Sequence, residues 1–327
     1  MTTAERPTSN SSIVVAVDLG RMNLQAGVVD ESHAIIGRSA AKTEAHRGLD
    51  AVLADLLQAI KQACRNANVD LDDVQAVGVC AAGAIDIPRG VVLNSPNLGW
   101  MDVPFRDLLA DRLQRPIVLD NDVNGAAWGE YHLGAGDGTG DALGVWVGTG
   151  VGGGFIINDR LIHGDLFTAG EIGHIVMRPD APRGRRTVED LCSRTALKSR
   201  IADRMADFPD SVVHDLAGGD PDRLSTTDLQ QAYDSGDELT TEIIDDAADL
   251  LGCAIANVVT LLSMRKVFLG GGVTEVLGPA YVKRVAASMR ANVFPERSQT
   301  CEILMTQLGP DSGILGAALL AFRALQR

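Results

Sequence analysis

Short apolar runs alternate with polar turns along the first 120 residues of the chain. These runs predict β-strands over residues 13–17, 24–29, 34–39, 74–80 and 116–119. Apolar positions on one face predict a helix over 49–66, and a shorter helix is expected over 105–113. The predicted order is three strands, helix, strand, helix and strand, with another helix starting after Asp122.

The second half of the chain repeats this order. Strands are predicted over 143–147, 155–157, near Leu161, and over 267–269 and 302–306. Helices are predicted over 243–262, 281–291 and 314–325. The polar stretch at 207–237 is interpreted as a surface insertion. Two copies of one strand-and-helix pattern imply a duplicated α/β fold.

A duplicated chain of 327 residues fits two domains rather than one core. We place a smaller N-terminal domain at 12–122, joined by the C-terminal helix at about 312–327, and a larger domain at 123–311. Residues 1–11 are polar and predict a disordered lead-in. Ligands often bind where domains meet, so the cleft between the two halves is the expected site.

A glycine-rich turn follows the predicted strand at 143–147. Its glycines lack a side chain that would hold the backbone away from a ligand, and they can adopt positive φ. Their N–H groups can therefore form a nest around a phosphate; the alternative is a glycine-rich hairpin without a ligand. The spacing matches neither the Walker nor the Rossmann pattern. The predicted nucleotide contacts in this turn are Gly148, Thr149, Gly150, Val151, Gly152, Gly153 and Gly154.

Composition and charge exclude several classes of function. Apolar residues make up 46% and charged residues 22% of the chain, as in soluble globular proteins. The formal net charge of −14 argues against a nucleic-acid partner, because such binding depends on neutralising phosphates. No apolar run is long enough to span a membrane, and the N-terminus lacks the apolar core of a secretion signal. The five scattered cysteines favour reduced thiols, so a cytoplasmic location is expected.

Two acidic strand ends are candidates for chemistry. Asp18 ends the first strand and Gly20 lets backbone approach closely, so this carboxylate can hold a hydrated Mg²⁺ that faces nucleotide phosphates. The alternative is an ordinary turn aspartate. Asn121 and Asp122 stand between a strand and a helix. One of the two can cap the helix, and the other, Asp122 in our interpretation, can accept a proton from a substrate hydroxyl.

Two further turns contain glycines beside candidate ligand-binding groups. Glu171 and His174 lie three positions apart between glycines, so they can converge on a ligand with several hydroxyls. A lone histidine can equally be a structural hydrogen-bonding group. The turn Gly270–Gly272 follows an apolar strand, and bare backbone at Gly271 and Gly272 can contact an adenine.

Together these motifs resemble the ROK family of sugar kinases and related repressors. The resemblance extends from Ile13 to Leu325. It depends most on the Gly148–Gly154 turn and on the Ala169–His174 sequence AGEIGH, and the segment Asn94–Trp100 supports it.

The resemblance implies a ribonuclease-H-like fold of the actin and hexokinase type, with two domains flanking a cleft. It implies that Asp122 is the catalytic base and that nucleotide phosphates bind between the Asp18 turn and the Gly148 turn. The sugar ligands that it implies are Asn97, Asn121, Asp122, Glu171, His174 and Glu189.

The first phosphate turn departs from the family pattern D-x-G-G-T. Here it is Asp18-Leu19-Gly20-Arg21-Met22, so one glycine and the threonine are absent. Arg21 either crowds the phosphates or replaces the lost backbone contacts with a guanidinium pair.

The zinc motif of many family members, C-x-C-G-x-x-G-C, is also missing. Asp180, Pro182 and Thr187 stand where its cysteines would be, and Cys192 lies too far along the chain. One histidine does not make a tetrahedral zinc site, so we predict no zinc and assign His174 to the substrate alone.

The leading expectation is a kinase that uses ATP and Mg²⁺ to phosphorylate a glucose-like hexose, at O6. The main alternative is a catalytically weakened sugar-binding relative, because of Arg21 and Met22. A sugar-responsive regulator is disfavoured, since such proteins carry a winged helix-turn-helix segment and only about a dozen residues precede Ile13. The expected partners are a sugar and further copies of this chain in a homodimer or larger homo-oligomer, without nucleic acid or membrane.

Overall fold

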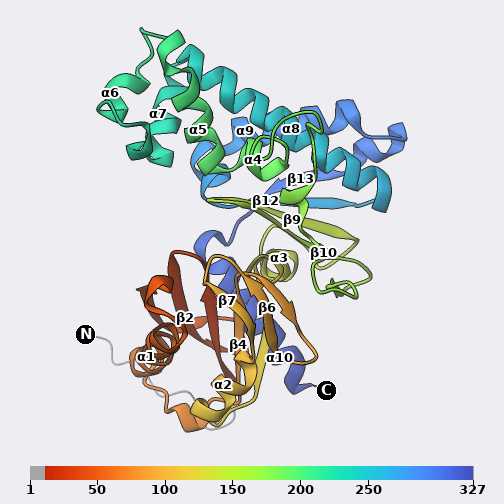
Figure 1. Cartoon of the computed structure of the whole chain (residues 1–327). Helices are drawn as coiled ribbons and strands as arrows, with labels where there is room; N and C mark the ends of the chain where they lie inside the picture. The colour runs from red at the N-terminus through yellow and green to blue at the C-terminus, as the bar shows by residue number, and fades with distance from the viewer. Residues whose placement is uncertain (1–11, 327) are drawn as a thin grey trace, which may run out of the picture. The chain divides into compact units, whose positions relative to one another are not determined.

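The computed structural model describes residues 12–326, so the lead-in predicted over residues 1–11 lies outside the described part of the chain. The chain forms two compact units (Figure 1). Unit 1 contains the residues up to Asp137, the segment His163–Ala169 and the residues from Pro310 onward. Unit 2 contains Gly138–Ile162 and Gly170–Gly309.

Unit 1 is built on a five-stranded sheet in the order β3-β2-β1-β4-β8. The first three strands pair antiparallel, and β1, β4 and β8 run parallel to one another. The strands are β1 (Ile13–Leu19), β2 (Asn23–Asp30), β3 (Ile35–Lys42), β4 (Ala76–Ala81) and β8 (Ile117–Asn121). β1 and β4 are buried along almost their whole length, as expected for strands covered on both faces.

Helices cover both faces of this sheet. α1 (Leu49–Ala67) shares a core with the apolar side chains of Val77 and Val79 in β4. Between these two, Gly78 faces the other side, where a Cβ atom would overlap the backbone of Ala317 in α10 (Ser312–Leu325). The missing side chain thus lets α10 lie directly on the strand.

The packing of α3 (Asp122–Leu133) against α10 also depends on glycine. A Cβ atom at Gly316 would overlap the carbonyl oxygen of Gly125, and one at Gly129 would overlap that of Ser312. Glycine inside a helix costs about 1 kcal/mol relative to alanine, so these positions are explained by the close approach. α3 lies in unit 1. The domain limits that we inferred from the sequence remain a prediction.

The sequence pattern does not predict the second, smaller sheet of unit 1. Its antiparallel strands are β5 (Ala84–Asp86), β6 (Val91–Ser95) and β7 (Trp100–Val103). Each is only three to five residues long, too short for a recognisable apolar run. The ring of Trp100 lies 4.9 Å from that of Phe105, the first residue of α2 (Phe105–Leu113).

Unit 2 has a five-stranded sheet in the order β11-β10-β9-β12-β13. Again three strands pair antiparallel, and β9, β12 and β13 run parallel. The strands are β9 (Ala142–Val147), β10 (Val151–Ile156), β11 (Leu161–Ile162), β12 (Lys266–Gly270) and β13 (Glu302–Met305). The two sheets share one order of connections and directions, and this confirms the duplicated α/β fold.

The helices of unit 2 extend beyond those that the apolar pattern predicts. They are α4 (Val188–Cys192), α5 (Arg194–Arg204), α6 (Val213–Ala217), α7 (Thr226–Asp234), α8 (Glu238–Leu262) and α9 (Gly272–Asn292). The stretch interpreted as an insertion at 207–237 contains α6 and α7, which bury Val213 and Leu229 in the unit's core. α9 starts earlier than predicted and bends at Gly278, where φ is 70°.

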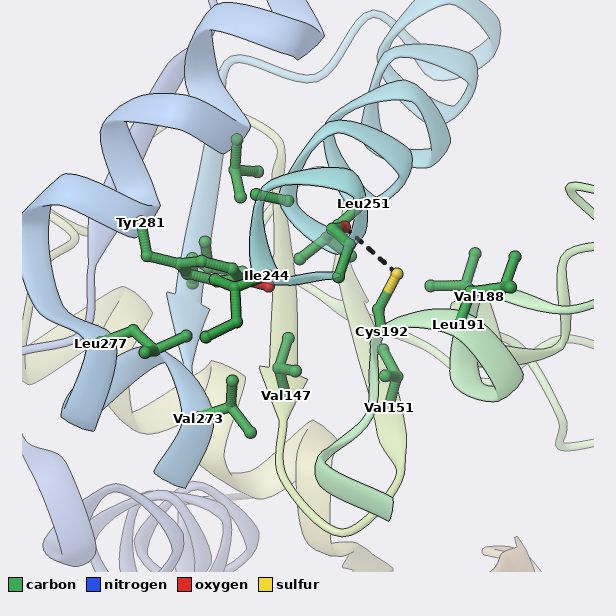
Figure 2. Close-up of a cluster of buried hydrophobic side chains, with 14 of the residues drawn as sticks. Val147, Val151, Val188, Leu191, Cys192, Ile244, Leu251, Val273, Leu277 and Tyr281 are labelled. Atoms are coloured by element: carbon green, nitrogen blue, oxygen red, sulfur yellow. Dashed lines mark hydrogen bonds between the residues drawn. The ribbon is translucent and has the colours of Figure 1, made fainter. Parts of the chain in front are cut away.

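The core of unit 2 joins the sheet to α4, α8 and α9. Figure 2 shows Val147 of β9 between Val273 of α9 and Val151 of β10, with Cys192 of α4 next to Val151. The buried thiol of Cys192 donates to the carbonyl oxygen of Ala247 at 3.3 Å, and burial raises its pKa to about 12. Across residues 12–326, no helix is both long and apolar enough to cross a membrane.

Candidate active site

Three polar side chains form a row across the sheet of unit 1. The register pairs Asp18 of β1 with Cys80 of β4, and Cys80 with Asp120 of β8. Laterally paired residues point to the same face of a sheet, so all three face α10 and α3. A Cβ atom at Gly313 would overlap the Asp18 carboxylate, which therefore lies against the first turn of α10.

Asp18 and Asp122 interact electrostatically. Burial of the Asp18 carboxylate and then the negative charge of Asp122 raise the pKa of Asp18 to about 7. A cation that binds here would relieve this repulsion. Within residues 12–326, no group of three or more His, Cys, Asp or Glu side chains is arranged to hold a metal ion. The hydrated Mg²⁺ expected near Asp18 stays a prediction from the sequence.

The turn after Asp18 is closed by a hydrogen bond from the Gly20 N–H to the carbonyl oxygen of Asn23, at 3.0 Å. Arg21 and Met22, the two departures from the family pattern, are both exposed in this turn. The backbone of Met22 is fixed, since its carbonyl oxygen accepts from the Thr43 N–H at 2.9 Å.

Asn121 caps α3, and Asp122 is the first residue of that helix. The Asn121 side-chain oxygen accepts from the N–H groups of Val123 and Asn124 at 2.9 and 3.1 Å, and its amide donates to the carbonyl oxygen of Gly83 at 3.0 Å. The Asp122 carboxylate accepts from the Val123 N–H at 3.0 Å and is half-buried. The capping task therefore belongs to Asn121, and the negative charge of Asp122 lies at the favourable end of the helix dipole.

The glycine-rich turn is shorter than predicted. Gly152, Gly153 and Gly154 belong to β10 and pair with residues of β9, so only Gly148–Gly150 connects the strands. None of the glycines from 148 to 154 has positive φ, so this turn does not use the freedom of glycine to adopt a left-handed backbone. The Gly148 N–H donates to the carbonyl oxygen of Gly150 at 2.8 Å, which tightens the turn.

Close packing requires glycine at two positions of this stretch and at one position of the segment that lies on it. A Cβ atom at Gly150 would overlap the Glu189 carboxylate, and one at Gly153 would come too close to the carbonyl oxygen of Gly170. A Cβ atom at Gly173 would overlap the carbonyl oxygen of Val151. The segment that carries Glu171 and His174 thus lies directly on β10.

Contacts from α4 and α5 hold the turn, and the sequence analysis missed two of the residues that make them. Arg194 donates from its backbone N–H to the carbonyl oxygen of Gly148 at 2.8 Å and from its guanidinium to the Thr149 hydroxyl at 2.6 Å. The Thr195 hydroxyl donates to the carbonyl oxygen of Thr149 at 2.9 Å. In the sequence, Ser193-Arg194-Thr195 shows only the signal of an ordinary helix N-terminus.

Glu189 contacts the same turn from α4. One of its carboxylate oxygens accepts from the Val151 N–H at 2.8 Å. Thr187 caps α4 in a reciprocal capping box with Asp190. Thr187, one of the residues at the positions of the zinc cysteines, therefore helps to place Glu189 through ordinary hydrogen bonds.

The other predicted sugar ligands lie on exposed turns. Glu171 and His174 flank a single helical turn, and a carboxylate oxygen of Glu171 lies 3.8 Å from Nε2 of His174. Their side chains are 48% and 66% exposed, so both are accessible to a ligand. Asn97 is exposed in the turn between β6 and β7.

Gly271 and Gly272 begin α9. Gly271 has φ of 87°, and a Cβ atom there would overlap the backbone of Val147, so this position requires glycine. A Cβ atom at Gly272 would meet nothing within 4 Å. The N-terminus of α9 thus starts beside the end of β9, where the glycine-rich turn also begins.

The candidate residues divide between the units. Asp18, Asn97, Asn121 and Asp122 belong to unit 1. The glycine-rich turn, Glu171, His174, Glu189 and the start of α9 belong to unit 2.

The model of the ROK family matches residues 14–324. The chain belongs to the ROK family. A glucokinase from Thermotoga maritima is 31% identical over 314 residues, which cover 93% of this chain and 96% of that protein. An N-acetylmannosamine kinase from Yersinia pseudotuberculosis is 33% identical over 316 residues, which cover 95% of this chain and 99% of that protein.

A solved structure of the ROK family agrees with this assignment. It is a glucokinase from Streptomyces griseus in complex with glucose and AMPPNP, with 30% identity and a TM-score of 0.83. The match covers 95% of this chain and 100% of that one. The ROK family assignment therefore extends over both units, and sugar kinases with two different named substrates are among the relatives.

Proposed function

We propose that this ROK family protein is an ATP-dependent kinase that transfers a phosphoryl group to a glucose-like hexose, at O6. The observation that carries the proposal is the position of Asp122, half-buried at the junction of β8 and α3 and close enough to Asp18 to raise its pKa. The similarity to a glucokinase bound to glucose and AMPPNP supports both substrates.

Asp122 accepts the proton of the attacking sugar hydroxyl in this proposal. A positioned general base of this kind contributes about 10²–10⁴-fold to a rate. Because Asn121 caps α3, the capping role does not compete with this use of Asp122. Mg²⁺ held near Asp18 would supply positive charge to the triphosphate.

The remaining groups position the two substrates. We assign the phosphates to the Thr149 hydroxyl and the N-terminus of α9, whose dipole favours anions. We assign the sugar hydroxyls to Glu171, His174 and the second carboxylate oxygen of Glu189, with Asn97 and Asn121 as further ligands. Phosphoryl transfer depends mainly on such positioning and on electrostatic stabilisation.

The substrate is tested with a panel of sugars. ADP release is measured with ATP and Mg²⁺ in the presence of glucose, mannose, N-acetylglucosamine or N-acetylmannosamine, and phosphorus NMR identifies the phosphorylated hydroxyl. We expect the highest kcat/KM with glucose and a 6-phosphate product. A preference for N-acetylmannosamine, the substrate in the name of the Yersinia relative, would contradict the proposed sugar.

Arg21 and Met22 support a second candidate, a sugar-binding protein with weakened catalysis, because they alter the first phosphate turn. The double substitution Arg21→Gly with Met22→Thr tests it, since it restores a glycine and a threonine. A wild-type kcat above about 1 s⁻¹, typical of kinases, favours the enzyme. Sugar binding without turnover, together with a gain of activity in the double variant, favours the second candidate.

A further inference from the structure

Asp120 is a buried carboxylate, 3% exposed, at the end of β8. One oxygen accepts from the Asn121 N–H at 2.8 Å and from the Asn124 side-chain amide at 2.9 Å. The other lies 2.8 Å from Nε2 of His163. Asp120 thus connects three parts of unit 1: the cap of α3, the first turn of α3 and a distant segment of chain.

The distant segment, His163–Ala169, belongs to unit 1 although the residues on both sides of it belong to unit 2. Its ends are joined, because the Ala169 N–H donates to the carbonyl oxygen of His163 at 3.1 Å. A second bond, from the Phe167 N–H to the carbonyl oxygen of Gly164 at 3.3 Å, tightens the loop. The chain therefore enters and leaves unit 1 at one place, beside the imidazole of His163.

The surroundings of Asp120 are rich in negative charge. Asp18 and Cys80 lie beside it in the same row of the sheet, and Asp122 follows two residues later. Burial and the charges of Asp120, Asp18 and Asp122 raise the pKa of the Cys80 thiol, so it stays neutral. Burial lowers the pKa of His163, but its hydrogen bond to Asp120 and the charge of that carboxylate give a net rise.

We propose that His163 is a positioning residue of the phosphoryl-transfer site. Its bond to Asp120 fixes the end of β8 and therefore the positions of Asn121 and Asp122. The same bond fixes the point at which the chain leaves unit 1 and continues towards Glu171. The catalytic part of this inference rests on the proposed function. The structural part is that the imidazole of His163 fixes the loop 163–169 and the cap of α3. This part is independent of the proposed function.

The experiment compares His163→Leu with His163→Gln. Leucine removes the donor to a buried carboxylate oxygen, whereas glutamine keeps an N–H group on a side chain of similar length. His214→Gln is the matched control, because the Nε2 of that histidine contacts two backbone carbonyl oxygens in unit 2, those of Met205 and Phe208. Steady-state kinetics and hydrogen exchange of the backbone amides are measured for each variant.

We expect His163→Leu to lower kcat about 100-fold, the effect of misplacing a reacting group by about 1 Å. The KM for ATP should change by less than about threefold, because His163 acts on the base and not on the nucleotide. His163→Gln should recover most of kcat, and the control should match the wild type. A merely structural role would lower the amount of folded enzyme and leave kcat per folded molecule unchanged.

Hydrogen exchange separates this inference from the proposed function. If the wild type phosphorylates no sugar, the kinase proposal fails, and the inference still predicts faster exchange at Ala169 and Asn124 in His163→Leu but not in His163→Gln. If the leucine variant does not fold, Asp120→Asn takes its place, with the same expectation. Unchanged exchange at both amides, or a leucine variant with wild-type kcat, would overturn the inference.

Discussion

The carboxylate of Glu189 accepts a hydrogen bond from the backbone N–H of Val151 at 2.8 Å. A residue that we assign to the sugar is thereby joined to the turn that we assign to the phosphates. We predict that Glu189→Ala raises the KM for both sugar and ATP, since it removes the acceptor from the turn. Glu189→Gln keeps an acceptor and should raise mainly the KM for the sugar. An alanine variant with an unchanged KM for ATP would show that this bond does not shape the turn.

Arg194 is predicted to support nucleotide binding through Thr149. Its guanidinium donates to the Thr149 hydroxyl at 2.6 Å, and a hydrogen bond from a charged donor is worth about 1.5–3 kcal/mol. Arg194→Ala should therefore raise the KM for ATP by about tenfold or more, with little change in the KM for the sugar. Arg185→Ala is the control, because Arg185 is 63% exposed and its surface pair with Asp203 is worth little. Equal kinetics in the two variants would refute the role of Arg194.

The stability of the protein should fall between about pH 4 and pH 7 because of Asp18. The pKa of Asp18 is raised from 3.8 to about 7, first by burial and then by Asp122, so the folded state keeps a proton that the unfolded state releases. Stability therefore decreases as pH rises through this window and levels off above it. Asp18→Asn should remove this dependence and stabilise the protein at pH 8 by about 1–3 kcal/mol.

Urea unfolding at pH 5 and pH 8 measures this effect. The control is Asp111→Asn, which changes an exposed carboxylate on α2. A gain of stability at pH 8 in both variants would point to net charge rather than to the site. A loss in Asp18→Asn at pH 8 would contradict the predicted sign.

Gly316→Ala should destabilise unit 1. The new Cβ atom would overlap the carbonyl oxygen of Gly125, so α10 would have to move away from α3, at a cost of about 1–3 kcal/mol. Gly272→Ala, where a Cβ atom meets nothing within 4 Å, should stay within about 1 kcal/mol of the wild type. Thermal unfolding of the two variants compares a position where the added methyl group has no room with one where it has room. Similar melting temperatures would show that the α3–α10 contact tolerates separation.

Much of the fold was open to prediction because its main strands are long and apolar. Almost every residue of β1 and of β9 is buried. The strands that pair with each of them follow in the same order along the chain, so the duplication is visible in the sequence. The strands β5, β6 and β7 gave no such signal, because three to five residues are too few to distinguish a strand from a loop.

The site was predictable only where a local motif marks it. The Gly148–Gly154 stretch is recognisable in the sequence, but none of its glycines has positive φ, and at Gly150 and Gly153 the structure shows close packing against Glu189 and Gly170. The bond between Asp120 and His163 joins residues 43 positions apart, and no local pattern announces such a pair. Arg194 was missed for the same reason, since its partner Thr149 lies 45 positions earlier.

The role of Asp122 is tested most directly by ADP release with ATP, Mg²⁺ and glucose, comparing the wild type with Asp122→Asn. Loss of the general base should lower kcat by about 10²–10⁴-fold. Glucose affinity, measured by calorimetry, should change by less than about tenfold, as expected for a lost interaction made mainly in the transition state. A variant that keeps the wild-type kcat, or a wild type that binds glucose and releases no ADP, would contradict the proposed mechanism.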